Sequence, residues 1–400
     1  MPAFVGNSLM ADSARKFAAA TCVNTDIRQA VNEVLDEINQ QLPSIDLVVA
    51  FFSAPFIETL ENNPGILADR CSTQNVIGCS AESIIGGDRE FENEPAISLW
   101  AASLPGCTVR TMHLQFLRAS DGGAFTGWPA DLESEWPKNS SLICLGEPLT
   151  FPSDVLLSNL NEDHPGLPVV GGMASCALGS NRLIVGDQMV EDGAASVLIS
   201  GEVHSFTVVS QGCRPIGEPA VVTKAEANEI LQIRGEPALE FLQKLYATLP
   251  TREQRLVREG LHIGRVISEY QDRRQFGDYL VRNVMSADPE RQSVCVGDFI
   301  RAGQTIQFHI RDHASADADL QQWLRNAQAE IPAGANMGGL LFTCNGRGTN
   351  LFPHADHDAS LIQQTLGPLP LAGFFAAGEL GPVARQNFVH GYTASLVLFW

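Results

Sequence analysis

The chain of 400 residues is 44% hydrophobic and 18% charged, and its net charge is -20. A chain of this length usually divides into more than one hydrophobic core, so we expect two domains. The excess of acidic side chains disfavours nucleic acid as a partner, because the phosphates would be repelled over most of the surface. No run of eighteen apolar residues occurs, so the sequence predicts no membrane-spanning helix.

The N-terminal residues and the cysteines indicate the cellular compartment. The first residues lack the basic start and the long apolar stretch of a secretory signal, which predicts a cytoplasmic protein. The nine cysteines form no C-x-x-C pair, so they indicate buried reduced thiols rather than a disulfide framework or a zinc ribbon.

An amphipathic helix is predicted near the start, in "DIRQAVNEVLDEINQQL", behind the capping segment "VNT". Its apolar residues recur at helical spacing, and we expect this face to pack on the first sheet. The predicted buried positions are Ile27, Val31, Val34, Leu35 and Ile38.

A strand, helix, strand, strand unit is predicted to recur three times. Its first strand lies in "SIDLVVAFFSAP" (44–55), "SSLICLGEPLTFP" (140–152) and "GGLLFTCNGRG" (338–348), and each ends in a loop of small or polar residues. The helices follow in "FIETLENNPGIL", "SDVLLSNLNED" and "HDASLIQQTLG", with Ser153 and Asp358 predicted as N-cap residues of the second and third.

The second strand of each unit runs into a glycine, in "NVIGCSAES", "LPVVGGMAS" and "LPLAGFFAAGE". Gly78, Gly171 and Gly373 are therefore predicted to be equivalent. The third strands are "AISLWAA", "AASVLISG" and "TASLVLFW", each after a polar linker. Such repetition predicts an α+β fold of layered sheets covered by helices, for which αββα is one arrangement.

A further helix is predicted in "EPALEFLQKLYATL" (236–249), with Pro237 near its first turn. The polar turn "QGCRPIGEP" precedes this helix and predicts a boundary near residue 215. The predicted domains are therefore residues 1–215 and 216–400.

Several segments resemble the FIST proteins, named for F-box and intracellular signal transduction. The N-terminal half carries "VIGCSAESIIGG" and "EDGAASVLISG", and the C-terminal half carries "VGDFIRAGQTIQFHIRDHASADADL", "LLFTCNGRG" and "LAGFFAAGELGPVARQNFVHGYTASLVLF". Together they resemble a FIST N-terminal domain followed by a FIST C-terminal domain.

The resemblance implies a sensory protein of bacterial signal transduction that binds a small ligand such as an amino acid. No F-box-like segment or transmitter module accompanies these motifs, so we expect the chain to report through a separate signalling protein. Neither a dinucleotide fingerprint nor a P-loop occurs, and no cofactor is expected.

The candidate ligand site lies on loops that follow the predicted strands, where a rigid scaffold usually presents binding groups. Gly346 and Gly348 permit a tight turn, Arg347 offers a planar fork for a carboxylate, and Glu379 could neutralise an ammonium group. The predicted ligand-binding residues are Cys344, Asn345, Gly346, Arg347, Gly348, Glu379, His390, Tyr392 and Arg311.

Other interpretations of these residues stay open. Arg347 and Glu379 could pair with each other, and His390 could be a satisfied core histidine. Cys344 could be an enzyme's nucleophile with a histidine as its base, although no activity is expected.

Two further interpretations concern metals and partners. "HADHD" (354–358) contains metal-ligand types, but its spacing is common in solvated loops and no metal is expected. A protein-interaction scaffold without a ligand is the remaining alternative. Cys79 and Ser80 are expected to form only a structural strand end, because the nucleophile-elbow pattern is absent.

Overall fold

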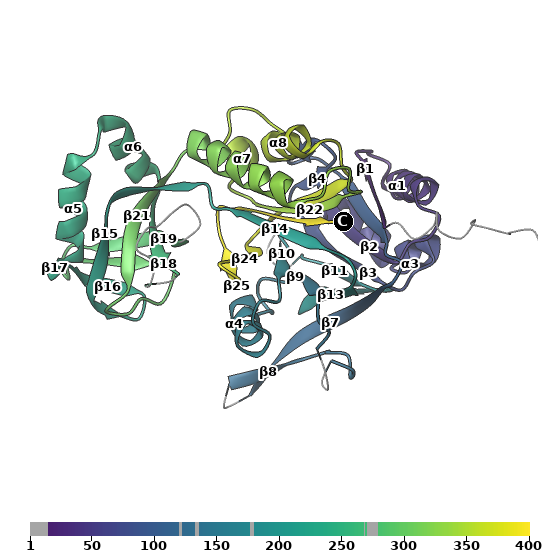
Figure 1. Ribbon diagram of the computed structural model, residues 1–400, viewed down its shortest axis with the longest axis horizontal. Helices are drawn as coiled ribbons and strands as arrows, with labels where there is room; N and C mark the ends of the chain where they lie inside the picture. Colours follow the sequence, from purple (N-terminus) through teal and green to yellow (C-terminus); the bar gives the residue numbers. More distant parts are fainter. Residues whose placement is uncertain (1–14, 120–121, 133–135, 177–179, 268, 270–278) are drawn as a thin grey trace, which may run out of the picture.

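The computed structural model describes residues 15–119, 122–132, 136–176, 180–267, 269 and 279–400. In this part of the chain, three mixed sheets form a core and a fourth sheet forms a lobe beside it (Figure 1). Helices cover the outer faces of the core sheets, so the predicted α+β class is confirmed. No helix of the described residues is long and apolar enough to cross a membrane.

The predicted unit is present three times. In each copy the first strand pairs in parallel with the second and antiparallel with the third, with helical turns between the first two. The first copy comprises β2 (Leu47–Ser53), η1 (Ala54–Phe56), α2 (Ile57–Glu61), α3 (Ile66–Cys71), β3 (Val76–Ala81) and β6 (Ile97–Ser103). The second comprises β9 (Ser140–Gly146), α4 (Ser153–Asp163), β10 (Val169–Met173) and β13 (Ala194–Gly201). The third comprises β22 (Gly338–Cys344), η2 (Gly348–Asn350), α8 (His357–Leu366), β23 (Leu371–Ala376) and β26 (Ala394–Phe399).

The three glycines predicted to be equivalent have equivalent surroundings. Gly78, Gly171 and Gly373 each face a residue of the parallel first strand, and a Cβ at any of them would overlap that residue's carbonyl oxygen. Any larger residue would therefore push the two strands apart. The equivalence predicted from the sequence is confirmed.

The polar linkers hold hairpins that the sequence did not reveal. Each hairpin leaves its own unit and extends the sheet of another, so that the three units exchange strands in a ring. The hairpin β4 (Ile84–Gly86) and β5 (Arg89–Phe91) joins β23, β11 (Leu183–Val185) and β12 (Gln188–Val190) joins β3, and β24 (Glu379–Val383) and β25 (Gln386–His390) joins β10. Strands from both sides of residue 215 therefore share two of the sheets.

Each core sheet also has a further strand beside its third one. These are β1 (Lys16–Cys22) on β6, β7 (Cys107–Ala119) with β8 (Gly122–Thr126) on β13, and β14 (Ser205–Ser210) on β26. After β14 the chain leaves the core for the lobe, close to the boundary predicted near residue 215.

The lobe is inserted between β14 and α7 (His313–Glu330), the helix that brings the chain back to the core (Figure 1). The predicted helix at 236–249 is α5, which follows Pro237. The lobe comprises β15 (Cys213–Glu226), β16 (Glu229–Ile233), β17 (Glu236–Pro237), α5 (Ala238–Thr248), α6 (Thr251–Glu259), β18 (Leu261–Val266), β19 (Tyr279–Asp288), β20 (Ser293–Val296) and β21 (Thr305–Arg311).

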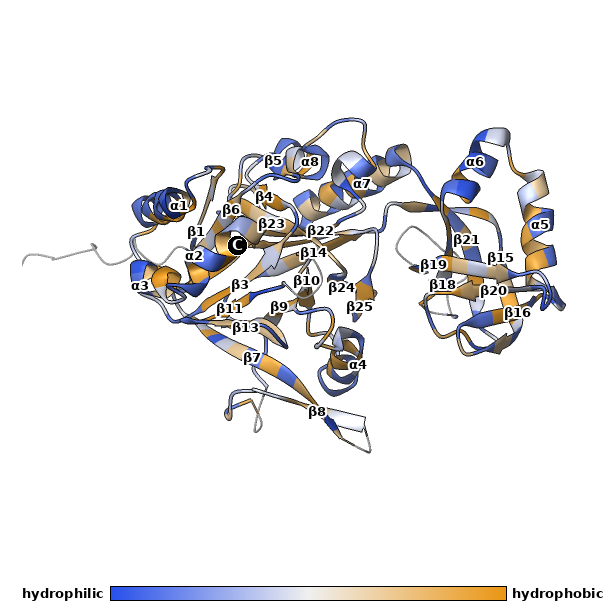
Figure 2. Ribbon diagram, turned by 180° about the vertical axis from the view of Figure 1, so that it is seen from behind, coloured by the Kyte–Doolittle hydropathy of each residue, from blue (hydrophilic) through white to orange (hydrophobic). Residues whose placement is uncertain are grey.

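The hydrophobic core lies where the inner faces of the three sheets meet. Phe51, Phe342 and Phe374 pack together there, with ring centroids 5.2 to 6.1 Å apart. Burial of each ring stabilises the fold by about 1.5–3 kcal/mol. Figure 2 shows hydrophobic residues along the core strands and hydrophilic residues on the outward helices.

The first helix is α1 (Ile27–Gln41), and its buried face matches the predicted one except that Ala30 is buried and Ile27 is only half-buried. It packs on β1 and β6, as expected. Its N-cap is Asp26, directly after the predicted "VNT", and the carboxylate accepts a hydrogen bond from the Gln29 amide at 3.1 Å.

The other two predicted caps are wrong. Ser153 is already inside α4, which begins after Pro152 without a side-chain cap. Asp358 is inside α8, and its carboxylate is engaged by an arginine instead. Glu90, from the exchanged hairpin of the first unit, accepts the amides of Asp358 and Ala359 at 2.9 and 3.0 Å. A cap supplied by another unit has no local sequence signal.

Candidate functional site

Three segments of the third unit converge where β22 ends. The Cys344 amide donates to the Thr393 carbonyl at 3.0 Å, and the Asn345 amide donates to the Ala376 carbonyl at 3.2 Å. Arg311, the last residue of β21 in the lobe, donates from Nη2 to the Gly346 carbonyl at 2.9 Å. The structure thus brings Cys344, Asn345, Gly346 and Arg311 together at the junction of core and lobe.

Arg347 is fully buried and forms a bidentate ion pair with Asp358. Its Nε and Nη2 donate to the two carboxylate oxygens at 2.6 and 2.8 Å, and its guanidinium lies 5.2 Å from the centre of the Phe352 ring. Burial opposes both charges, but the Arg347 guanidinium holds the pKa of Asp358 well below its usual range. The charge of Arg347 is therefore already neutralised, and only Nη1 lacks a hydrogen-bond partner.

Glu379 begins β24 and is also fully buried, but no ion pair neutralises it among the described residues. Its Oε2 accepts hydrogen bonds from the amide and hydroxyl of Thr393 at 3.1 and 2.8 Å, whereas Oε1 has no partner of good geometry. Burial raises the pKa of this carboxyl to about 8, despite the favourable Thr393 bonds. Burial therefore disfavours the ionised form of Glu379.

Arg311 is a half-buried cation, and it has no carboxylate partner in the described part of the chain. Its guanidinium stacks over the Tyr392 ring at 4.9 Å, and its Nε is buried without a hydrogen-bond partner. Burial and the charge of Arg347 lower the pKa of Arg311 from its ordinary value. A carboxylate beside Arg311 would favour the charged form of its guanidinium and could accept a hydrogen bond from Nε.

Both Glu379 and Arg311 are close enough to Cys344 for their charges to act on the pKa of its thiol. Burial and then the Glu379 carboxylate raise the pKa of the thiol to about 11, so it is a neutral thiol at physiological pH. Cys79 is fully buried in β3, and the neighbouring Ser80 hydroxyl accepts the Arg182 amide at 2.8 Å, as a structural strand end would.

The remaining predicted residues make contacts within the protein. His390 bonds through Nε2 to the Gly381 carbonyl at 2.9 Å, and burial lowers its pKa to about 4, so the ring is neutral. Tyr392 adopts a positive φ of 66° and its hydroxyl accepts a hydrogen bond from Asn283 at 2.8 Å. Gly348 has φ 55°, and a Cβ there would overlap the Glu92 carboxylate. Their ligand contacts stay a prediction.

The lobe contributes neighbours that the sequence did not single out. His262 of β18 meets the Tyr392 ring edge-on, with centroids 4.8 Å apart, and its Nδ1 is buried without a partner. Gln211 joins core and lobe by donating to the Tyr279 carbonyl at 2.6 Å. Single strand residues of this kind belong to no motif, so only the fold reveals them.

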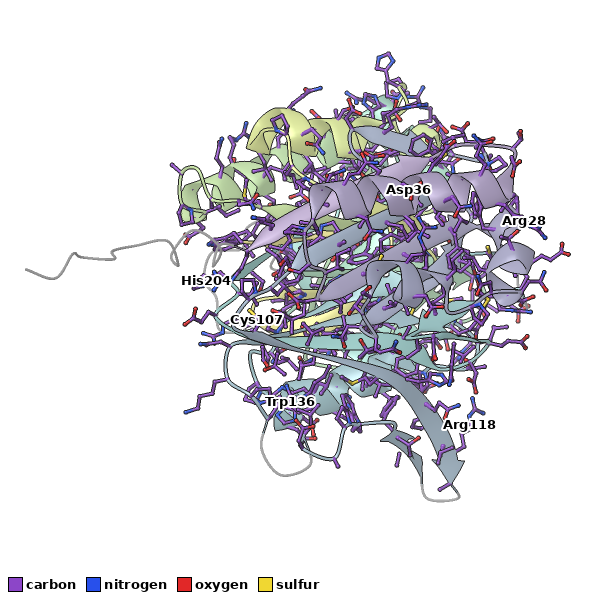
Figure 3. All side chains as sticks on the ribbon, turned by 90° about the vertical axis from the view of Figure 1, so that its right-hand side faces the viewer. Arg28, Asp36, Cys107, Arg118, Trp136 and His204 are labelled. Atoms are coloured by element: carbon purple, nitrogen blue, oxygen red, sulfur yellow. The ribbon has the colours of Figure 1, made fainter. Side chains whose placement is uncertain are left out.

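Two cavities lie at opposite ends of β9. One of about 670 Å³ opens beyond its carboxyl end and is lined by Pro148, by Asn345 of the predicted loop and by residues of all three units. The other, about 1200 Å³, surrounds the start of β9, where Trp136 and His204 line it on the same side of the molecule (Figure 3). None of the predicted site residues lines the second cavity.

No group of three His, Cys, Asp or Glu side chains suited to a metal ion occurs within the described residues. In "HADHD", His357 bonds to Asp317 and Asp358 instead, and its ring stacks on Phe352. The polar residues of this segment hold the start of α8 in place.

Comparison with known proteins identifies the two halves of the chain. Residues 46–236 match the FIST N domain and residues 238–382 match the FIST C domain. An uncharacterized protein of Mycobacterium tuberculosis is 44% identical over 326 residues, covering 81% of this chain and 83% of that protein. An uncharacterized protein of Mycobacterium bovis is 38% identical over 390 residues, covering 96% and 98% respectively. The chain therefore belongs to the FIST family, whose domains are signal-transduction domains.

Proposed function

We propose that this protein is a bacterial sensor that binds a small zwitterionic ligand, such as an amino acid, between Arg311 and Glu379. The observation that carries the proposal is the pair of incompletely paired groups near Cys344. Arg311 has no carboxylate partner among the described residues. Although the Thr393 bonds, the charge of Arg347 and the Cys344 thiol favour the ionised Glu379 carboxyl, its Oε1 is buried without a hydrogen bond of good geometry. Such unsatisfied buried groups are rare unless a ligand completes them.

Arg311 takes the role that the sequence assigned first to Arg347. A ligand carboxylate meets the free Nε of Arg311 in this proposal, because Asp358 already occupies two nitrogens of Arg347. Each charge-assisted hydrogen bond would contribute about 1.5–3 kcal/mol. Gly346 holds the guanidinium in place through its carbonyl, and Tyr392 supports its flat face.

Glu379 receives the ammonium group. Because its pKa of about 8 lies above neutral pH, the carboxyl must release a proton to pair with that group. Binding should therefore release close to one proton per ligand at pH 7, and affinity should rise with pH up to about 8. A ligand without an ammonium group would cause no such release.

The experiment is calorimetric titration with an amino acid panel in two buffers of different ionisation enthalpy. Wild type should bind at least one member and release a proton, whereas Arg311→Met should abolish binding and Glu379→Gln should abolish the proton release. Arg255→Met, at an exposed arginine of the lobe, is the matched control. Equal binding by wild type and Arg311→Met would refute the proposal.

We further propose that the protein works in the cytoplasm and reports through a separate signalling protein. Support comes from membership of a signal-transduction family. Affinity purification of the tagged chain with and without ligand should recover one partner in a ligand-dependent amount. Recovery that is the same for wild type and Arg311→Met under all ligand conditions would instead favour a scaffold.

The alternative of a cysteine-dependent enzyme has weaker support. A nucleophilic cysteine needs a thiolate near neutral pH, but burial raises the pKa of Cys344 to about 11. Of the groups beside it, Arg311 is a cation, and burial disfavours the ionised form of Glu379 that a base would need.

A further inference from the structure

The cavity beyond the carboxyl end of β9 is built by the three repeated units together. Ser53, Pro148 and Asn345 follow or end the first strands, and Ala81, Ala174 and Ala377 follow or end the second strands. Its volume of about 670 Å³ is in the range of small-molecule sites. Ligands in layered folds commonly bind at such carboxyl ends.

Three side-chain hydrogen-bond donors around this cavity are already used by the protein. Ser53 donates to the Ala96 carbonyl at 3.2 Å, and Ser175 donates to the Phe375 carbonyl. Cys176 points its thiol to the Ala81 carbonyl at 3.4 Å. These groups offer a ligand no proton.

Two side-chain amide oxygens at the cavity, in contrast, accept no hydrogen bond from the described residues. Asn181 is 3% exposed, and its Nδ2 donates to a Glu147 oxygen at 3.2 Å, while its Oδ1 has no partner. The carboxylate fixes the amide orientation, because a flipped amide would set two oxygens against each other. The Oδ1 of Asn345 is also buried and has no hydrogen-bond partner among the described residues.

The charges around the cavity also favour a cationic ligand. Glu82 and Glu94 line it and are exposed or half-exposed, and no lysine or arginine lines it in the described part of the chain. The net charge of -20 adds a long-range attraction for cations. Two carboxylates alone fall short of the ligand set of a metal ion, and the described residues supply no third.

We propose that this cavity binds a small aliphatic amine in its ammonium form. The amide oxygens of Asn181 and Asn345 accept its N–H groups at the buried end, and Glu82 and Glu94 neutralise charge at the open end. The site is separate from that of Arg311 and Glu379, which do not line the cavity.

Calorimetric titration with 1,4-diaminobutane tests this, with 1,4-butanediol as the uncharged probe of similar shape. Wild type should bind the diamine at one saturable site that weakens with added salt, and it should not bind the diol. Glu82→Gln and Glu94→Gln should each weaken binding about threefold, within the range of exposed ion pairs. Glu162→Gln, at an exposed glutamate of α4, is the matched control and should bind like wild type.

Asn181→Leu should weaken diamine binding about tenfold or more, through loss of the free Oδ1. Asn181→Leu also removes the hydrogen bond to Glu147. Asn345→Leu therefore tests ligand binding at the buried end of the cavity without that loss. The proposal is wrong if wild type shows no saturable binding up to roughly 10 mM, or if the diol binds equally. It is also wrong if Glu379→Gln abolishes diamine binding while the Glu82, Glu94 and Asn181 variants keep wild-type affinity.

Discussion

Arg347→Met should unfold the protein far more readily than any other arginine substitution in the described chain. The substitution leaves Asp358 buried without its bidentate partner, and it removes the charge that chiefly lowers the pKa of this carboxyl in the wild type. Breaking a buried ion pair by removing one member destabilises a protein by about 3–5 kcal/mol. Thr343 and His357 still bond to Asp358 at 2.9 Å each, so we expect the lower end of that range.

The measurement is the urea midpoint at pH 7, with the slope of the transition checked against wild type. The double variant Arg347→Met with Asp358→Leu should recover at least half of the loss, because it removes the uncompensated carboxylate. Arg255→Met is the control: this arginine pairs with Glu259 at 3.5 Å with both side chains largely exposed, and its loss should change stability by less than about 0.5 kcal/mol.

The variant Arg311→Met tests whether Arg311 binds the ligand or, like Arg347, stabilises the fold. Arg311 has no counter-charge to leave behind, so its loss should change the unfolding free energy by less than about 1 kcal/mol while ligand binding disappears. If Arg311→Met proves as destabilising as Arg347→Met, or if Arg347→Met is as stable as the Arg255 control, the assignment of roles is refuted.

Three further outcomes follow from the same structure. The free energy of unfolding should fall between about pH 6.5 and pH 8. Burial raises the pKa values of Glu90 and Glu379 to about 8, so the folded state is favoured only while these carboxyls are protonated. Each carboxyl lowers the free energy of unfolding by up to about 1.4 kcal/mol per pH unit. Below pH 6.5 the buried histidines, with pKa values lowered to about 4, oppose this trend. In thermal melts, Glu90→Gln and Glu379→Gln should each lose about half of the decline above pH 6.5. Iodoacetamide should alkylate Cys344 at pH 7 on the order of a hundredfold more slowly than a free thiol, as followed by peptide mass spectrometry, and a faster rate would revive the enzyme hypothesis. Gly373→Ala should destabilise the fold by several kcal/mol, about as much as overpacking a core, whereas Gly391→Ala, which meets open space, should melt like wild type.

The repeated unit could be predicted from the sequence because its signals are local. Within each unit, the first apolar run, the turns and the glycine lie within about thirty residues of one another. The glycine marks a close approach between neighbouring strands of that unit. The exchanged hairpins escaped prediction for the opposite reason. A strand such as β4 pairs with β23, nearly three hundred residues away, and nothing in its three residues specifies that partner.

The candidate site was predicted in part for similar reasons. The sequence placed Cys344, Asn345 and Gly346 on one loop and named Arg311 as a further candidate, but it did not indicate that Arg311 lies beside that loop. It could not distinguish the two arginines, because the partner of Arg347 is set by the packing of α8 against β22 and by Glu90 from another unit. Which charge is compensated depends on the fold, not on the spacing of residues.

The two proposed sites arise in different ways from the threefold repetition. The amine cavity lies where the units are alike, since each contributes the ends of its first and second strands. The zwitterion site lies where they differ, because only the third unit receives the lobe, and the lobe supplies Arg311. Asn345 belongs to both, as its backbone follows Cys344 and its side chain lines the cavity. The loop after β22 is therefore the segment that adjoins both proposed sites, through the bond from Arg311 to Gly346 and through Asn345 at the cavity.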